Sequence, residues 1–229
     1  MSTPPFLDLP AGVRDEPVGT GRGTFAALRS GPDLDDEQGD GHGEAHPDGH
    51  SDGPSDRHRV VVLVPGFTGS KEDFIAVLAP IGAAGFPVVA YDQRGQHGTA
   101  ALTPQAPPEG WELDAFAADL LAVVDRVAGP RPTAVHLLGH SFGGLVARAA
   151  VLRDPARFSS LVLLDSGPAS IGPERDARLI ALADALPTLG LAPVWQIMQA
   201  LELEAGNHPP GDPEVAEFLE RRLQAHDPL

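Results

Sequence analysis

Four short runs of β-branched and aliphatic residues, each followed by a turn, do most to restrict the fold of this 229-residue chain. Strands that are apolar on both faces are typical of a parallel sheet covered by helices. Segments with helical spacing separate the runs, and one of them opens with a Ser70-x-x-Asp73 cap. The alternation predicts a three-layer α/β/α sandwich with a mainly parallel sheet. The runs are 60–64, 87–91, 134–138 and 161–164, and the helical segments are 70–84, 113–128 and 143–153.

We interpret residues 1–229 as a single domain with two segments of distinct composition. Residues 33–58 contain almost no large apolar side chain to offset the entropy of ordering, so a disordered acidic loop insertion is predicted there. Before it, residues 21–31 are predicted as a strand entering a hairpin. Residues 168–229 contain three stretches with Pro near a first helical turn and are predicted to form a helical lid.

Charge and composition exclude several classes of partner. The net charge of -16 argues against nucleic acids and anionic membranes, although nine acids of residues 33–56 account for much of it. No apolar run reaches the ~18 residues of a membrane span, and the chain has no cysteine. The sequence therefore predicts a cytoplasmic protein with a small-molecule substrate, no nucleic-acid or membrane partner, and no cofactor. Four histidines of the acidic segment could bind a divalent cation weakly, but its Gly and Pro residues fix no geometry, so no metal site is predicted.

The strongest functional signal is Gly139-His140-Ser141-Phe142-Gly143, which lies between the predicted strand 134–138 and a small-residue helix. A Gly-x-Ser-x-Gly sequence in that context is typical of a strained strand-to-helix turn that exposes a nucleophilic serine. The alternative is a glycine-rich turn of another α/β protein. The loop Pro65-Gly66-Phe67 follows the first strand run, and its N–H groups could stabilise an oxyanion together with the N–H of Phe142. For that loop, the alternative is a plain Pro-Gly turn.

These motifs, with Tyr91-Asp92-Gln93-Arg94-Gly95, resemble the α/β-hydrolase superfamily, in particular its bacterial esterase, proline-iminopeptidase and haloperoxidase-like group. The resemblance implies that Ser141 is the nucleophile and that Phe67 and Phe142 supply the oxyanion N–H groups. It also implies that residues 92–95 form a structural loop near the pocket.

The resemblance weakens after residue 164. In the superfamily an acid and then a histidine follow the nucleophile, on the last strands of the sheet. No such strands can be recognised before residue 229, so we expect the last strands, the acid and the histidine to be missing from this chain. Asp165 is an alternative acid at the end of its strand. His208 and His226 are expected to be solvent-exposed. His97 is expected to lie in a surface loop, and the alternative is that it lines the pocket.

The favoured function is a serine hydrolase that cleaves small, apolar esters or amides by acyl transfer through Ser141. Because the acid and histidine are expected to be missing, we expect the 229-residue chain itself to be inactive or only weakly active. The alternative is a non-catalytic binding protein built on a truncated hydrolase fold. Trp111 and Trp195 are expected to be packing residues, and the alternative for Trp195 is that it faces the pocket. Apolar lid residues are expected to form an acyl pocket over the serine: Leu186, Leu189, Leu191, Val194, Ile197, Met198 and Leu201.

Overall fold

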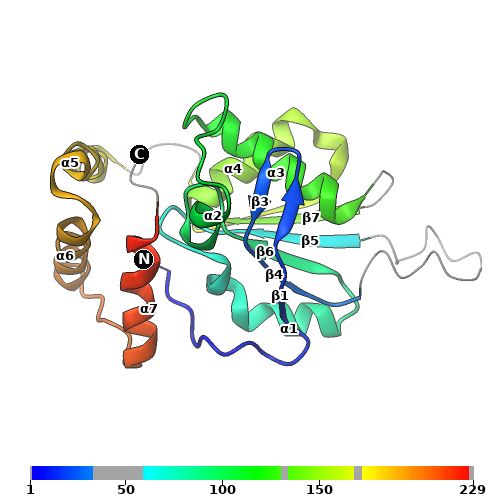
Figure 1. Cartoon of the computed structure of the whole chain (residues 1–229), viewed down its shortest axis with the longest axis horizontal. Coiled ribbons are helices and arrows are strands. Elements are labelled where there is room, and N and C mark those ends of the chain that lie inside the picture. Colours follow the sequence, from blue (N-terminus) through cyan, green and yellow to red (C-terminus); the bar gives the residue numbers. More distant parts are fainter. Residues whose placement is uncertain (1, 33–58, 130–133, 168–171, 227–229) are drawn as a thin grey trace, which may run out of the picture.

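A six-stranded sheet forms the centre of the computed structural model, which describes residues 2–32, 59–129, 134–167 and 172–226 (Figure 1). Its strands follow the order β1-β4-β6-β5-β7-β8. The last four strands in this order are parallel to one another, whereas β4 is antiparallel to β6 and to β1. The strands are β1 (Arg14–Asp15), β4 (Ala27–Ser30), β5 (Arg59–Val64), β6 (Val88–Tyr91), β7 (Ala134–His140) and β8 (Phe158–Leu164).

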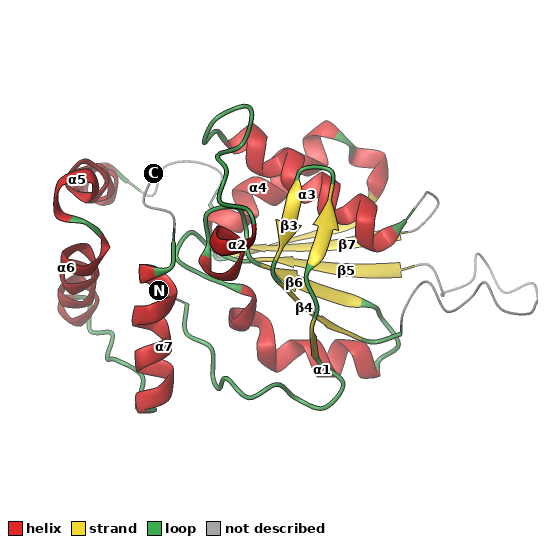
Figure 2. Cartoon of the chain, in the orientation of Figure 1, coloured by secondary structure: helices red, strands yellow, loops and turns green. Residues whose placement is uncertain are grey.

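Helices cover both faces of the sheet, because successive residues of its central strands point to opposite sides (Figure 2). Val62 of β5 packs with α3 (Leu113–Ala128) and α4 (Phe142–Arg153), while its neighbour Leu63 packs with α1 (Ile75–Ala83). The predicted three-layer α/β/α architecture is therefore confirmed. The predicted Ser70 cap also forms, at a 3-10 helix η2 (Lys71–Phe74) that precedes α1.

A second, two-stranded sheet lies beside α3 and is formed by the hairpin β2 (Val18–Thr20) and β3 (Gly23–Phe25). Val18 and Phe25 are buried in the same core cluster as α3. The predicted strand of residues 21–31 is thus divided between β3 in this hairpin and β4 in the main sheet. The acidic segment 33–58, with its four histidines, lies outside the described residues.

Three helices lie on the side of the sheet where the parallel strands end (Figure 1). They are α5 (Pro173–Leu189), α6 (Leu191–Glu204) and α7 (Pro213–Gln224). Trp195 of α6 packs with Phe218, Leu219 and Leu223 of α7, whereas Ile180 of α5 is 62% exposed. In the part of the chain that the structure describes, no helix combines the length and apolar character needed to cross a bilayer.

Strand β8 forms one edge of the sheet, and β7 is its one neighbour among the described residues. Its last three residues, Val162, Leu163 and Leu164, are 43 to 49% exposed although all are apolar. Strands of parallel sheets are usually buried on both faces. The edge of β8 is therefore open and apolar close to Ser141, which follows β7.

Candidate active site

Ser141 occupies a strained turn between β7 and α4. Its backbone angles, φ 51° and ψ -119°, lie in a region that residues with a Cβ rarely adopt. The Ser141 N–H donates a 2.9 Å hydrogen bond to the carbonyl oxygen of Leu164 at the end of β8. The serine is thereby held at the carboxyl ends of the strands, where active sites of open α/β sheets lie.

The glycines around Ser141 are required by close backbone contacts. A Cβ on Gly139 would lie 2.4 Å from the carbonyl oxygen of Gly143. A Cβ on Gly143 would lie 2.4 Å from the carbonyl oxygens of both Val64 and Pro65. The Gly-x-Ser-x-Gly spacing therefore lets the start of α4 pack directly against the end of β5.

The loop after β5 lies against the serine. A Cβ on Gly66 would be 3.3 Å from the Ser141 Cβ, and the rings of Phe67 and Phe142 meet edge to face at 6.3 Å. The Phe67 N–H has no hydrogen-bond partner among the described residues. Phe142 is the first residue of α4, where N–H groups have no partner within the helix. The structure thus brings together Ser141, Phe67 and Phe142, the three residues singled out from the sequence.

Residues 92–95 form a buried loop beside this site. The Asp92 carboxylate accepts hydrogen bonds from the backbone N–H of Lys71 at 2.7 Å and of Gly98 at 3.0 Å. Burial raises the pKa of Asp92 to about 7, against the opposing effect of the Lys71 ammonium, whose Nζ lies 3.3 Å away. Through these hydrogen bonds Asp92 links η2 to the start of α2 (His97–Leu102).

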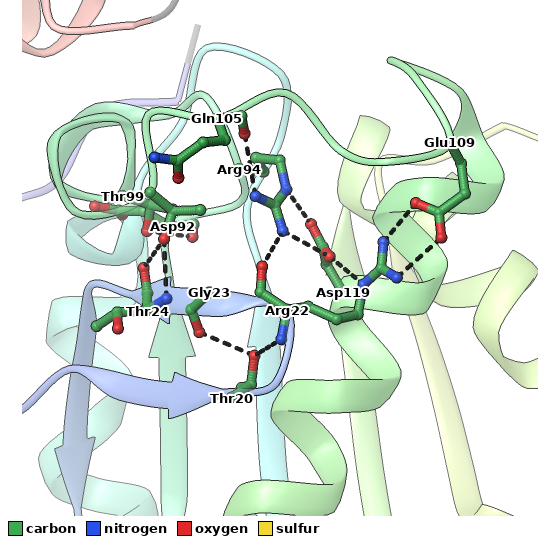
Figure 3. Close-up of polar contacts among 11 residues, drawn as sticks. Thr20, Arg22, Gly23, Thr24, Asp92, Arg94, Thr99, Gln105, Glu109 and Asp119 are labelled. Atoms are coloured by element: carbon green, nitrogen blue, oxygen red, sulfur yellow. Dashed lines mark hydrogen bonds and ion pairs between the residues drawn. The ribbon is translucent and has the colours of Figure 1, made fainter.

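A charged network fixes the same loop to α3 and to the β2–β3 hairpin (Figure 3). Arg94 donates to both Asp119 oxygens, at 2.7 and 3.0 Å, and to the Arg22 carbonyl at 2.6 Å. Arg22 also donates to Asp119 and pairs with Glu109 at 2.7 Å. Arg94 and Asp119 are almost fully buried, so this pair is a structural support without access to a substrate.

The part of the chain that carries this site matches a known protein family. The family model described as alpha/beta hydrolase fold matches residues 59–189, which include Ser141 and the Phe67 loop. The chain belongs to the α/β-hydrolase family.

Two curated relatives match part of this chain. The RutD protein of Variovorax paradoxus, named for carbamate hydrolysis, is 38% identical over 106 residues, which are 46% of this chain and 37% of that protein. A monoacylglycerol lipase of Mycolicibacterium smegmatis is 34% identical over 115 residues, which are 50% of this chain and 39% of the lipase. The chain therefore matches less than half the length of either relative.

Solved structures share the fold of this chain. An enol-lactonase from Burkholderia xenovorans LB400 has a TM-score of 0.63 and 17% identity, with 93% of this chain and 69% of that chain covered. A carboxylesterase from Nitrososphaera gargenis has a TM-score of 0.63 and 14% identity, with 93% and 68% covered. At these identities the likeness concerns the fold alone.

Two histidines of the chain lie elsewhere than the sequence suggested. His226 is half-buried, because α7 packs against the core and directs His226 Nδ1 to the Arg222 carbonyl at 2.7 Å; the expectation of exposure was wrong. His97 is also largely buried, with its ring edge-on to Phe218 at 5.4 Å, so the prediction of a surface position was wrong. Burial lowers the pKa of both imidazoles, that of His97 to about 4.

The remaining candidates for an acid or base are not brought to the nucleophile. Asp165 follows β8 with φ 47° and is exposed, and His208 is exposed in the loop before α7. Among the described residues, no histidine hydrogen-bonds to the Ser141 hydroxyl. The same residues contain no cluster of three or more side chains suited to a metal ion.

The lid helices α6 and α7 pack against each other, and the pocket between them does not include Ser141. A cavity of about 320 Å³ lies between α6 and α7, and its lining includes Trp195, Pro209 and Leu219 but not Ser141. Trp195 is 8% exposed and packs in the lid core, as expected for a packing residue. Of the apolar lid residues expected over the serine, Val194 is buried, whereas Leu189 and Ile197 are 46% and 39% exposed.

Proposed function

We propose that this chain carries the nucleophile and oxyanion site of a serine hydrolase that cleaves small, apolar esters or amides by acyl transfer. The observation that carries the proposal is Ser141, held in a strained turn beside the Phe67 N–H, from which no described residue accepts a hydrogen bond. The names of the relatives support the substrate class, because carbamates and monoacylglycerols both contain an acyl carbon bonded to oxygen or nitrogen.

In the proposed reaction the Ser141 hydroxyl attacks the carbonyl carbon of the substrate, and a histidine accepts the hydroxyl proton. The N–H groups of Phe67 and Phe142 donate hydrogen bonds to the oxyanion that forms on the former carbonyl oxygen. The same proton then passes to the departing alcohol or amine. Water hydrolyses the acyl-serine and regenerates the free hydroxyl.

We place the acid and the histidine on strands that extend the sheet beyond β8. The open apolar edge of β8 supports this placement, because Ser141 is hydrogen-bonded to its last residue, Leu164. A strand paired there would end beside the serine, as the parallel strands of such a sheet do.

Hydrolysis of a p-nitrophenyl ester tests the proposal. The 229-residue chain should be slow, because a serine and an oxyanion site without the base retain only ~10³ to 10⁴-fold acceleration over water. Ser141→Ala should remove that residual rate. Supplying a segment that bears the acid and histidine should raise the rate by orders of magnitude.

The other outcomes contradict the proposal in different ways. A slow rate that Ser141→Ala leaves unchanged favours the alternative of a non-catalytic binding protein. Full activity of the 229-residue chain that is lost on His226→Gln or Asp165→Asn would mean that a described residue completes the site.

A further inference from the structure

Two buried glutamines hold the backbone of the loop that faces Ser141. Gln93 Nε2 donates to the Pro65 carbonyl at 2.9 Å. Gln96 Nε2 donates to the next two carbonyls along the chain, those of Gly66 at 2.8 Å and Phe67 at 2.9 Å. Three successive carbonyl oxygens therefore accept hydrogen bonds from two side-chain amides that are 1% and 5% exposed.

The orientation of the Gln96 amide is fixed by the backbone. Its Oε1 accepts a 3.0 Å hydrogen bond from the Gln93 N–H, and its own N–H donates to the Gln93 carbonyl at 3.0 Å. An amide oxygen that accepts from a backbone N–H directs its NH₂ group the other way. The Gln96 NH₂ group consequently points at the loop, and the reversed amide would leave the Gly66 and Phe67 carbonyls facing an oxygen.

Because the peptide bond is planar, the direction of the Gly66 carbonyl also fixes the direction of the Phe67 N–H. In a planar trans peptide the carbonyl oxygen and the following N–H point to opposite sides. Because the Gly66 carbonyl faces Gln96, the Phe67 N–H must point away from Gln96. Gly66 itself lies against Ser141, because a Cβ added to Gly66 would be only 3.3 Å from the Ser141 Cβ.

We infer that Gln96, supported by Gln93, is a positioning residue that holds the Phe67 N–H toward the oxyanion formed at Ser141. The inference rests on the proposed function and adds a cause for the geometry of its oxyanion site. Neither glutamine side chain needs to touch the substrate, since both act through the carbonyls of residues 65–67.

The test compares three substitutions in the 229-residue chain. Gln96→Met keeps the side-chain length but removes both N–H donors, and Gln96→Glu places oxygen where the donors were. Gln105→Met is the matched control, because the Gln105 side chain is exposed in the same connection between β6 and α3. We expect both Gln96 variants to lower kcat for the p-nitrophenyl ester at least tenfold with KM within about twofold, because only the transition state carries the oxyanion. Gln105→Met should leave both constants unchanged.

A second measurement does not depend on turnover. In ¹⁵N-labelled protein, Gln96→Met should displace the Phe67 amide resonance and lower its heteronuclear NOE, and Gln105→Met should do neither. If the unsubstituted chain shows no hydrolysis that depends on Ser141, the proposed function fails, while displacement of the Phe67 amide still supports positioning by Gln96. An unchanged Phe67 amide in Gln96→Met overturns the inference whatever the activity. If Gln96→Met lowered the thermal stability but left kcat and KM unchanged, the role of Gln96 would be structural, and the inference would also be overturned.

Discussion

The Arg222 guanidinium of α7 donates a 2.7 Å hydrogen bond to the Asp73 carboxylate in η2, 149 residues earlier in the chain. Both side chains are buried, at 1% and 5% exposure. Arg222 also donates to the Ser2 carbonyl at 2.9 Å. This one side chain therefore connects the last described helix, the N-terminal segment and the turn that follows the Phe67 loop.

Loss of the Arg222 guanidinium should detach α7 from the core. Arg222→Met leaves the buried Asp73 carboxylate without its cationic partner, and we expect the free energy of unfolding to fall by about 3 kcal/mol. Arg221→Met is the control, because the Arg221 side chain is 62% exposed and its pair with Glu217 is long at 3.8 Å. It should change stability by less than about 0.5 kcal/mol. Urea unfolding measures both, and equal losses would show that Arg222 does not anchor α7.

His97 should make the protein sensitive to acid. Burial lowers its pKa to about 4 from the ordinary 6.5, with Lys71, His226 and Arg222 adding to the decrease and Glu72 opposing it. Between these two values the unfolded chain binds more protons than the folded one, so the contribution of His97 to stability is lost as pH falls from 6.5 toward 4. A shift of this size corresponds to on the order of 3 kcal/mol.

The comparison with His97→Asn isolates this contribution, because asparagine tolerates the φ of 30° at this position and does not titrate. The unsubstituted protein should lose more stability than His97→Asn when urea unfolding at pH 4.5 is compared with pH 7.5. The opposite contribution of Asp92, whose raised pKa favours the folded state at lower pH, is common to both proteins and cancels. His208 is exposed, so the His208→Asn variant should lose the same amount of stability as the unsubstituted protein between pH 7.5 and pH 4.5. Parallel pH profiles for all three would contradict the burial of His97.

The sequence predicted the sheet and its helices wherever hydrophobic periodicity was strong. β5 to β8 lie where the apolar runs occur, and α3 matches the predicted residues 113–128. β1 was not predicted, because its two residues, Arg14 and Asp15, carry no apolar pattern. α2 spans six residues, which is too short for a helical period to be visible.

The polar contacts around the site could be predicted less well, because they join residues distant in sequence. His226 was assigned to the surface from its position near the end, but the burial of Arg222 one turn earlier determines its environment. The loop contacts of Gln93 and Gln96 were not predicted. Their one available signal was the spacing of two amides in a loop that follows the apolar strand β6, which pairs with β5, the strand that ends just before Pro65.

Gly143 should tolerate no side chain. In Gly143→Ala the new Cβ would lie 2.4 Å from the carbonyl oxygens of Val64 and Pro65, which are backbone atoms that cannot rotate away. We expect a loss of at least about 2 kcal/mol in the free energy of unfolding. Gly211→Ala is the control, since a Cβ there meets nothing within 4 Å. A Gly143→Ala protein as stable as Gly211→Ala would show that α4 does not approach β5 as described.

Ser141 should be a position where glycine is more stable than alanine. At φ 51° and ψ -119° a residue with a Cβ carries strain of about 1 to 3 kcal/mol, which outweighs the ~0.5 to 1 kcal/mol that glycine loses in backbone entropy. Urea unfolding should therefore rank Ser141→Gly above Ser141→Ala by about 1 kcal/mol. Ser159, exposed in β8 with no positive φ, should show the reverse order for the same two substitutions. Both Ser141 variants should lack the ester hydrolysis that depends on the hydroxyl. If alanine were as stable as glycine at residue 141, the turn would not be strained, and the geometry on which the proposed nucleophile rests would be wrong.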